Sequence, residues 1–220
     1  MKTNFYSFFV LLSVFIACSS ASEEGASSGG AATEPEVDVA TRLELGLQAQ
    51  PRWMGFWKEA LPSFQVSDFQ VAGTLPMEDV SFPEKNPINA RHPLAAHQIR
   101  HPEGEGVVDI YSQKLALIEE GRLLLNPDSE IIFYKRDGMR ERLLFLGPSA
   151  SIEEAEWLDR ECLLVLGSME EEEGYRPMVW LIFPFEGEIQ LYRHQQIAPE
   201  LVRYAYLKEK FQDQIEERAF

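Results

Sequence analysis

The sequence predicts a mainly β protein in which two similar antiparallel sheets are flanked by a short helix on their N-terminal side and a helix at the C-terminus. Asp137-Gly138 lies between two strand-like runs, which indicates a tight β-hairpin. Gly138 and Gly187 are about 50 residues apart, a spacing typical of repeated β units. An amphipathic segment follows the last predicted strand and begins at Pro199.

Residues 1–17 have the pattern of a secretory signal peptide, with Lys2 followed by a largely apolar run. The run is shorter than the roughly 20 apolar residues that a transmembrane helix needs. Two plainer alternatives remain open at this point. One is an ordinary signal peptide cleaved near Ala21 or Ser22, and the other is an uncleaved anchor.

The residues Phe15-Ile16-Ala17-Cys18 resemble a bacterial lipobox, although Leu usually occupies the position of Phe15. The resemblance to bacterial lipoproteins implies that Cys18 carries lipid and that the protein is anchored to a membrane. Ser19 in place of Asp implies the outer membrane of a Gram-negative bacterium. Ser22-Glu23-Glu24 resembles a surface-export signal, and the domain would face the periplasm or the cell surface.

Residues 18–36 are rich in Ser, Gly and Ala and are typical of a flexible tether. The 220-residue chain carries 36 acidic and 20 basic residues, a net charge of −16, which argues against nucleic-acid binding because phosphate contacts need a basic surface. Its two cysteines exclude a disulfide-knotted miniprotein. Lipid on Cys18 would exclude an intramolecular disulfide, and the apolar run at Cys162 predicts a buried thiol.

Residues 37–96 are expected to form helical and loop segments that pack on the β-domain. Arg52–Phe64 places its apolar side chains at helical spacing and is interrupted by Pro62. Pro35–Gln50 has no decisive period and fits either a short helix or the end of the tether. Prolines predict a loop over Pro76–His92.

Residues 97–198 are expected to form the β-domain. The Asp137-Gly138 turn predicts a type I′ hairpin, in which both central residues have positive φ. The runs that we expect to be strands are Val107–Tyr111, Glu130–Arg136, Met139–Leu146, Ala155–Leu158, Glu161–Leu166, Met178–Phe183 and Glu188–Tyr192.

The strands fall into two copies of one unit, with Val107 and Leu163 each opening an apolar strand after a turn. The longer insert Lys114–Asn126 accounts for the unequal spacing. Pro102-Glu103-Gly104 and Trp157-Leu158-Asp159 resemble turns in blades of bacterial periplasmic β-propellers. This resemblance implies two blade-like sheets. Two blades cannot close a ring, so the chain is expected to be a sandwich of two small sheets, a partial propeller capped by its helices, or a protomer that closes a ring only with partner chains. The first two are favoured.

Residues 199–220 are expected to form the C-terminal helix, with a narrow apolar stripe over Pro199–Arg218. Docking on the domain is favoured over a coiled coil, because the segment spans barely three heptads. The stripe consists of Leu201, Tyr204, Ala205, Phe211 and Ile215, together with Lys208, which packs through its aliphatic stem.

The sequence predicts no catalytic, cofactor-binding or metal-binding residue. His97 and His101 have a metal-ligand spacing, but prolines bracket them and we expect loop histidines. The unspaced glutamates 170–173 are more typical of a solvated loop than of a calcium site. We therefore expect a membrane-anchored binding module whose partner is an envelope protein or a surface ligand. The alternative is an envelope hydrolase whose carboxylates converge only in the fold.

Overall fold

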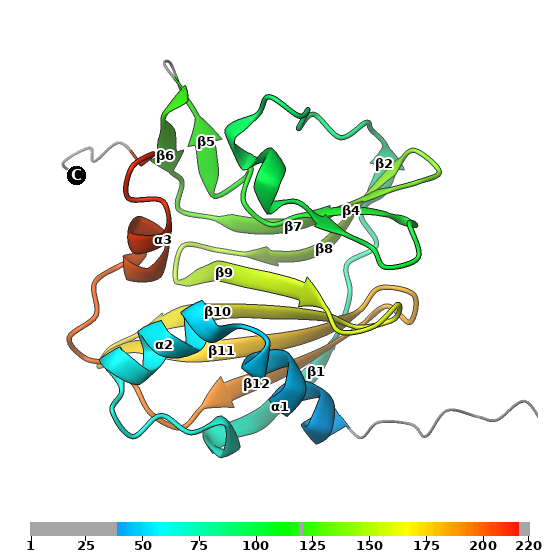
Figure 1. Cartoon of the computed structure of the whole chain (residues 1–220). Coiled ribbons are helices and arrows are strands. Elements are labelled where there is room, and N and C mark those ends of the chain that lie inside the picture. The colour runs from blue at the N-terminus through cyan, green and yellow to red at the C-terminus, as the bar shows by residue number, and fades with distance from the viewer. Residues whose placement is uncertain (1–38, 119–120, 216–220) are drawn as a thin grey trace, which may run out of the picture. The chain divides into compact units, whose positions relative to one another are not determined.

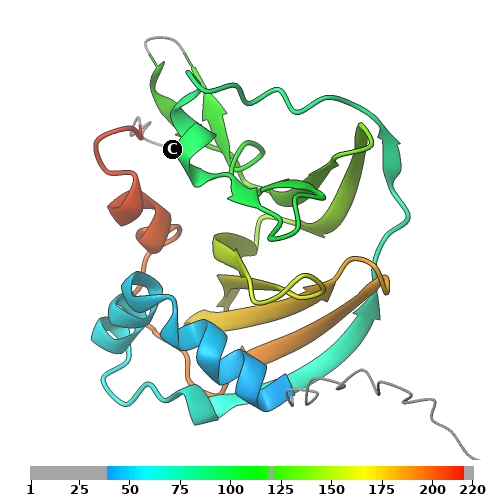
Figure 2. The same ribbon diagram turned by 45° about the vertical axis from the view of Figure 1, so that its right-hand side comes forward.

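The computed structural model describes residues 39–118 and 121–215, and the predictions for the signal peptide, for Cys18 and for the tether lie outside these ranges. The prediction of a mainly β protein is confirmed. Within the described residues, 12 strands form antiparallel sheets, accompanied by three α-helices and short 3₁₀ turns. Figures 1 and 2 show the arrangement from two directions.

Two five-stranded sheets make up most of the structure. Sheet A has the order β1-β12-β11-β10-β9 and sheet B the order β2-β8-β7-β4-β3. The strands of sheet A are β1 (Phe69–Pro76), β9 (Ala150–Trp157), β10 (Leu163–Glu171), β11 (Gly174–Phe183) and β12 (Glu188–His194). Those of sheet B are β2 (Ser81–Pro83), β3 (Ile99–Arg100), β4 (Gly106–Asp109), β7 (Ser129–Lys135) and β8 (Met139–Leu146).

The two sheets have the same connectivity. Each is a meander of four strands in chain order, and each gains a fifth strand from the segment before β3, since β1 pairs with β12 and β2 pairs with β8. The link between β4 and β7 holds a separate hairpin, β5 (Leu115–Leu117) with β6 (Leu123–Leu125). This hairpin lies within the insert that the sequence places at residues 114–126.

The hairpin between β7 and β8 is confirmed, but the predicted type I′ turn is wrong. Gly138 has φ +90°, whereas Asp137 is not among the residues with positive φ. Arg136, Asp137 and Gly138 separate the two strands, and the carboxylate of Asp137 accepts a hydrogen bond from the N–H of Met139 at 3.0 Å. A three-residue loop of this kind needs positive φ only at its last residue.

We expect Gly138→Val to lower the free energy of unfolding by about 1 kcal/mol or more, because a β-branched residue is strained at positive φ. A Cβ atom at this position would meet nothing within 4 Å, so the loss would report backbone strain and not a clash. The control is Gly55→Val, because Gly55 lies on a helix and a Cβ atom there would also meet nothing within 4 Å. Urea unfolding of both variants measures the difference in their free energies of unfolding. Equal losses in both variants would contradict the explanation.

Helices α1 (Val39–Gln48) and α2 (Pro51–Ala60) lie across one face of sheet A (Figures 1 and 2). The helix predicted around Trp53 is confirmed. It begins with Pro51 in its first turn and ends at Ala60, just before Pro62. Trp53 and Trp57 are fully buried against the sheet. Two 3₁₀ turns, η1 (Val66–Asp68) and η2 (Pro93–His97), complete this part of the chain.

The predicted C-terminal helix is much longer than the observed one, since α3 covers only Ala205–Lys210. Tyr204 has a left-handed backbone, with φ 61°, which interrupts a helix before α3. After the helix, the N–H of Leu123 donates to the carbonyl of Gln214 at 2.8 Å. Pairing with the β5–β6 hairpin therefore replaces helical hydrogen bonds that the apolar spacing alone predicts.

Two segments expected to be loops carry strands. The proline-rich segment from Pro76 contains β2, whose three residues add to the edge of sheet B, where prolines are tolerated. In the acidic run, Glu170 and Glu171 belong to β10 and are not in a loop. Glu171 forms an ion pair with Arg176 at 2.5 Å and Glu170 pairs with Arg203, so cations from neighbouring segments offset the repulsion.

Candidate functional site

A buried carboxylate lies beneath helix α2. The side chain of Glu153 on β9 is only 2 % exposed. Its Oε2 atom accepts hydrogen bonds from the indole Nε1 of Trp53 at 2.8 Å and of Trp57 at 3.4 Å, and its Oε1 atom accepts one from the hydroxyl of Ser168 at 2.6 Å. Glu153 thus joins α2 to strands β9 and β10 through three uncharged donors.

A β-bulge explains why this glutamate points inward. In the pairing of β9 with β10, Glu154 lies opposite Leu166 and Ile152 lies opposite Gly167, so Glu153 is the extra residue. The absence of a side chain at Gly167 lets the two strands approach closely there, because a Cβ atom would lie 2.1 Å from the carbonyl oxygen of Ser151. Such bulges change the direction of a side chain.

Burial controls the protonation of Glu153. It raises the pKa of this carboxyl from 4.5 to about 7, because the charged form loses its hydration, while the hydrogen bonds from Ser168, Trp53 and Trp57 oppose the rise. The three donors are neutral and only partly replace water. Glu153 therefore exchanges a proton near neutral pH inside the folded protein.

The next residue, Glu154, belongs to a second polar cluster that holds α3. Its Oε1 atom accepts hydrogen bonds from the hydroxyl of Tyr206 and from Nζ of Lys210, the latter at 2.5 Å. Lys210 also donates to the hydroxyl of Tyr111 at 2.7 Å, and that hydroxyl donates to the carbonyl of Glu153 at 2.6 Å. Burial lowers the pKa of Lys210 and raises that of Tyr206.

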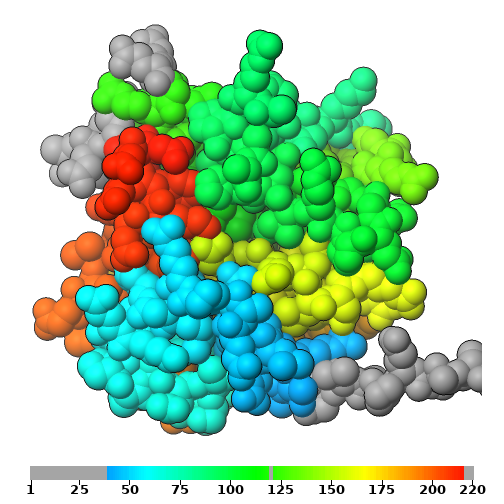
Figure 3. All heavy atoms as spheres, viewed as in Figure 1, coloured from blue at the N-terminus to red at the C-terminus, as the bar shows by residue number. Residues whose placement is uncertain are grey.

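The two clusters offer adjacent carboxylates, but in an enclosed setting. The rings of Trp53 and Trp57 cover Glu153, and the ring of Tyr206 packs on Phe56 of α2 at 5.3 Å between centroids. In the space-filling view, the red atoms around α3 lie directly against α2 (Figure 3). A substrate would reach Glu153 only after α2 had moved. Fixing α2 and α3 to the sheet is the role that these contacts support.

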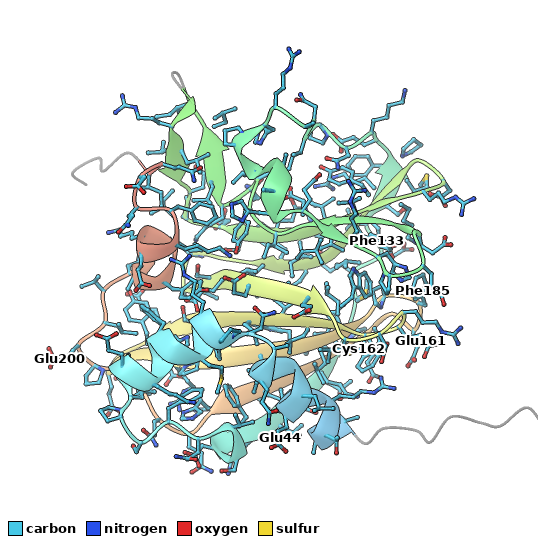
Figure 4. All side chains as sticks on the ribbon, in the orientation of Figure 1. Glu44, Phe133, Glu161, Cys162, Phe185 and Glu200 are labelled. Carbon is cyan, nitrogen blue, oxygen red and sulfur yellow. The ribbon has the colours of Figure 1, made fainter. Side chains whose placement is uncertain are left out.

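An open surface lies at the other end of sheet A. A groove of about 540 Å³ runs between α1 and the strands β1 and β12. Glu44 is the single charged residue among the described residues that line it, and its side chain accepts a hydrogen bond from Gln48 at 3.3 Å. Figure 4 labels Glu44 on α1, in the lower part of the view. The groove is lined by Val39, Ala40, Leu43, Glu44, Val66, Ser67, Phe69, Val71 and Tyr192.

Strand β1 is an edge strand of sheet A, because among the described residues it pairs only with β12. None of its eight residues, Phe69–Pro76, is charged, and its middle is exposed. Val71 is 67 % exposed and Leu75 is 47 % exposed. Edges of this length usually carry charges that prevent pairing with other chains. Here only a bulge at Ala72 and the terminal Pro76 interrupt the strand.

The register shows which backbone groups of β1 point to the open edge. The N–H of Gln195 donates to the carbonyl of Asp68, and the N–H of Met77 donates to the carbonyl of Gly187. Because hydrogen-bonded and non-hydrogen-bonded pairs alternate along an antiparallel ladder, the N–H and C=O groups of Val71 and Thr74 point away from β12. They are oriented to pair with a further strand.

His97 and His101, which have a metal-ligand spacing in the sequence, have separate surroundings, and so has the nearby His92. The ring of His97 packs on Tyr111 and Phe211, whereas Nε2 of His101 lies 2.8 Å from the carbonyl of Arg160 and Nδ1 of His92 accepts from the N–H of Leu94. Over residues 39–118 and 121–215, no group of three His, Cys, Asp or Glu side chains is placed to hold a metal ion.

Cys162 is buried, as predicted, and burial raises the pKa of its thiol to about 12. In the part of the chain that the structure describes, no helix has the length and apolarity needed to cross a membrane.

The sequence matches no protein-family model, and comparison with curated proteins and with solved structures gave no significant match.

Sequence reasoning missed both Glu153 and the β1 edge. Consecutive side chains of a regular strand point to opposite faces, so the sequence does not show that Glu153 and Glu154 both meet helices; the bulge allows this. For β1, the signal was the absence of charge over Phe69–Pro76 in a chain in which 25 % of residues are charged.

Proposed function

We propose that this chain is a lipid-anchored binding module of the cell envelope and that it contacts its partner through the open edge of β1. The observation that carries this proposal is an eight-residue, uncharged and exposed edge strand beside an apolar groove. Such an edge favours association with another chain, and soluble proteins normally protect it. The enclosed carboxylates support binding without catalysis.

The lipobox-like residues at Cys18 support the anchor. A lipid anchor with a flexible tether would confine the domain near the membrane and raise its effective concentration for partners there. With a charge of −16, the protein surface would repel anionic lipids, so attachment would depend on the lipid. The partner would be an envelope protein or a surface ligand, and the expected location of the anchored protein is the outer membrane.

Cys18→Ser should abolish labelling by a fatty-acid analogue in a Gram-negative host and should leave the protein unprocessed or soluble after envelope fractionation. In bacterial lipoproteins the sulfur atom of the lipobox cysteine, here Cys18, receives the diacylglyceryl group. Cys162→Ser is the matched control, because that thiol is buried in the domain, and it should label normally. Mature, membrane-bound protein from Cys18→Ser cells would contradict the anchor.

Site-specific photo-crosslinking in intact cells tests the binding surface. A photoreactive amino acid at position 71 should give discrete crosslinked products, because Val71 is exposed on the β1 edge. The same residue at position 202 is the control, since Val202 is 63 % exposed but lies far along the chain from β1. Equal or absent crosslinking at both positions would refute the proposed surface.

The adjacent carboxylates favour a second candidate, an envelope hydrolase. In that case Glu153→Gln or Glu154→Gln would eliminate a turnover detected with a panel of ester, amide and glycoside substrates. On the binding proposal, the panel shows no turnover that depends on either residue. A reproducible activity lost in one of these variants would replace the proposal with the enzyme.

We also infer that sheets A and B are two copies of one blade-like unit in a propeller-like or sandwich-like arrangement. Their shared connectivity supports this: β3-β4-β7-β8 corresponds to β9-β10-β11-β12, with β2 and β1 as the added strands. The positive φ of Gly138 and of Gly187 in corresponding turns agrees with it. The β5–β6 hairpin is then an insertion into one copy.

A further inference from the structure

We propose that the β1 edge takes up an extended peptide segment as an additional antiparallel strand, and that this segment combines apolar side chains with at least one lysine or arginine. This inference rests on the proposed function and specifies the chemistry of its partner. Three observations carry it: the orientation of backbone groups along β1, the apolar lining of the groove, and the charge at its rim.

The first requirement is backbone groups that are available for pairing, and within the part of the chain that the structure describes two residues of β1 supply them. Val71 and Thr74 present their N–H and C=O groups to the open edge on either side of the bulge. The N–H of Phe69 also points that way and is already used, since it donates to the carbonyl of Val66 in η1. The free stretch therefore starts after Phe69, and η1 limits the added strand at that end.

The second requirement is selectivity for the sequence of the bound peptide, and the side chains that line the groove supply it. Val71 and Phe69 line the groove, and α1 forms its opposite wall through Leu43 and Val39. Successive side chains of an added strand point to opposite faces of the sheet. Every second residue of the peptide would therefore face the wall formed by α1, where apolar side chains are favoured.

Charge supplies the third requirement. Among the described residues that line the groove, Glu44 is the only charged one, and Gln48, which donates a hydrogen bond to its side chain, carries no charge. The whole chain has a net charge of −16. An acidic peptide would be repelled, whereas a basic residue near Glu44 would gain a partner and would be attracted from a distance. The occupant is therefore an extended, basic and apolar segment of another protein.

The test selects binders from a random peptide library displayed on phage, with the full-length protein in detergent micelles as target. We expect the selected peptides to alternate apolar with other residues and to contain lysine or arginine. Val71→Lys should weaken their binding by about tenfold or more, and Glu44→Gln should weaken it severalfold and reduce its salt dependence. Val202→Lys, at an exposed site outside β1, should leave the affinity unchanged.

Methylation of the peptide backbone gives the decisive signature. In an added strand, alternate peptide N–H groups donate to β1 and the others point to solvent. N-methylation at one set of alternate positions should abolish binding, while methylation of the other set should be tolerated. Uniform tolerance, uniform loss, binders indifferent to Val71→Lys, or no binders at all would each overturn strand addition.

The outcomes separate this inference from the function on which it rests. If a residue at position 71 crosslinks to an envelope protein but no strand-like peptide binds, the surface is correct and the mode of recognition is wrong. If neither crosslinking nor peptide binding depends on Val71, the proposed function fails as well.

Discussion

Raising the pH from 5 to 8 should lower the free energy of unfolding of this protein, and Glu153→Gln should remove most of that loss. The pKa of Glu153 rises from 4.5 to about 7 in the folded chain because its carboxyl group is buried. A difference of this size corresponds to about 3 kcal/mol of stability. Urea unfolding followed by tryptophan fluorescence at both pH values measures the change.

The direction follows from proton linkage. The folded state holds the proton of Glu153 more tightly than the unfolded state, so the contribution is fully present below pH 4.5 and is lost as the pH rises through about 7. Glutamine keeps one carbonyl oxygen for the indoles of Trp53 and Trp57 and an amide that can donate to Ser168. The variant should match the wild type at pH 5 and exceed its stability at pH 8.

Other buried groups titrate in the same range and make the comparison with Glu153→Gln necessary. Burial lowers the pKa of His97 and of His194, which makes the folded state more stable as the pH rises, opposite to Glu153. Burial also lowers the pKa of Lys114 from 10.5 to about 8, so its contribution to the pH dependence of stability falls above pH 8, outside the compared range. These contributions are common to both proteins and cancel in the difference.

A third variant separates charge from hydrogen bonding. Glu153→Leu removes the acceptor and leaves the indole N–H groups of two fully buried tryptophans without it. Such unsatisfied donors cost about 1–3 kcal/mol each, so this variant should be less stable at both pH values.

Parallel curves of unfolding free energy against pH for the wild type and Glu153→Gln would show that Glu153 does not titrate as described.

Local signals in the sequence predicted the strands that are bounded by strong turns. The β7–β8 hairpin has Asp137-Gly138, and β11–β12 has Gly187, so each turn marks where its strands end. The edge strands β1 and β2 have no such turn and contain prolines at their ends. Their place is decided by pairing with β12 and β8, partners far away in the sequence, which a local pattern does not contain.

The same distinction applies to the candidate sites. The burial of Trp53 and Trp57 could be predicted from helical spacing, but their common partner could not, because Glu153 lies about a hundred residues later and faces inward only through a bulge. The predicted length of the C-terminal helix was wrong for a different reason. Its apolar spacing is genuine, but the left-handed Tyr204 and pairing with Leu123 limit the helix to six residues.

Glu154→Leu should lower the free energy of unfolding by about 3 kcal/mol, because it leaves the ammonium group of Lys210 buried without its counter-ion. The two side chains are only 15 % and 11 % exposed, and Nζ of Lys210 lies 2.5 Å from Oε1 of Glu154. The variant also takes away the acceptor of the hydroxyl of Tyr206. Helix α3 should loosen first, which faster amide exchange over residues 205–210 would report.

A double-mutant cycle isolates the ion pair. Adding Lys210→Met to Glu154→Leu should restore much of the lost stability, since no charge is then left buried, with a coupling energy of about 1–3 kcal/mol. The control pair is Glu170 with Arg203, whose side chains are 35 % and 49 % exposed. Glu170→Leu should cost only about 0.5 kcal/mol, because water solvates the remaining charge. Additive effects of the Glu154 and Lys210 substitutions would show that these side chains act independently. In that case the apolar packing of Leu207 and Phe211, both nearly or fully buried, would hold α3, and not the ion pair.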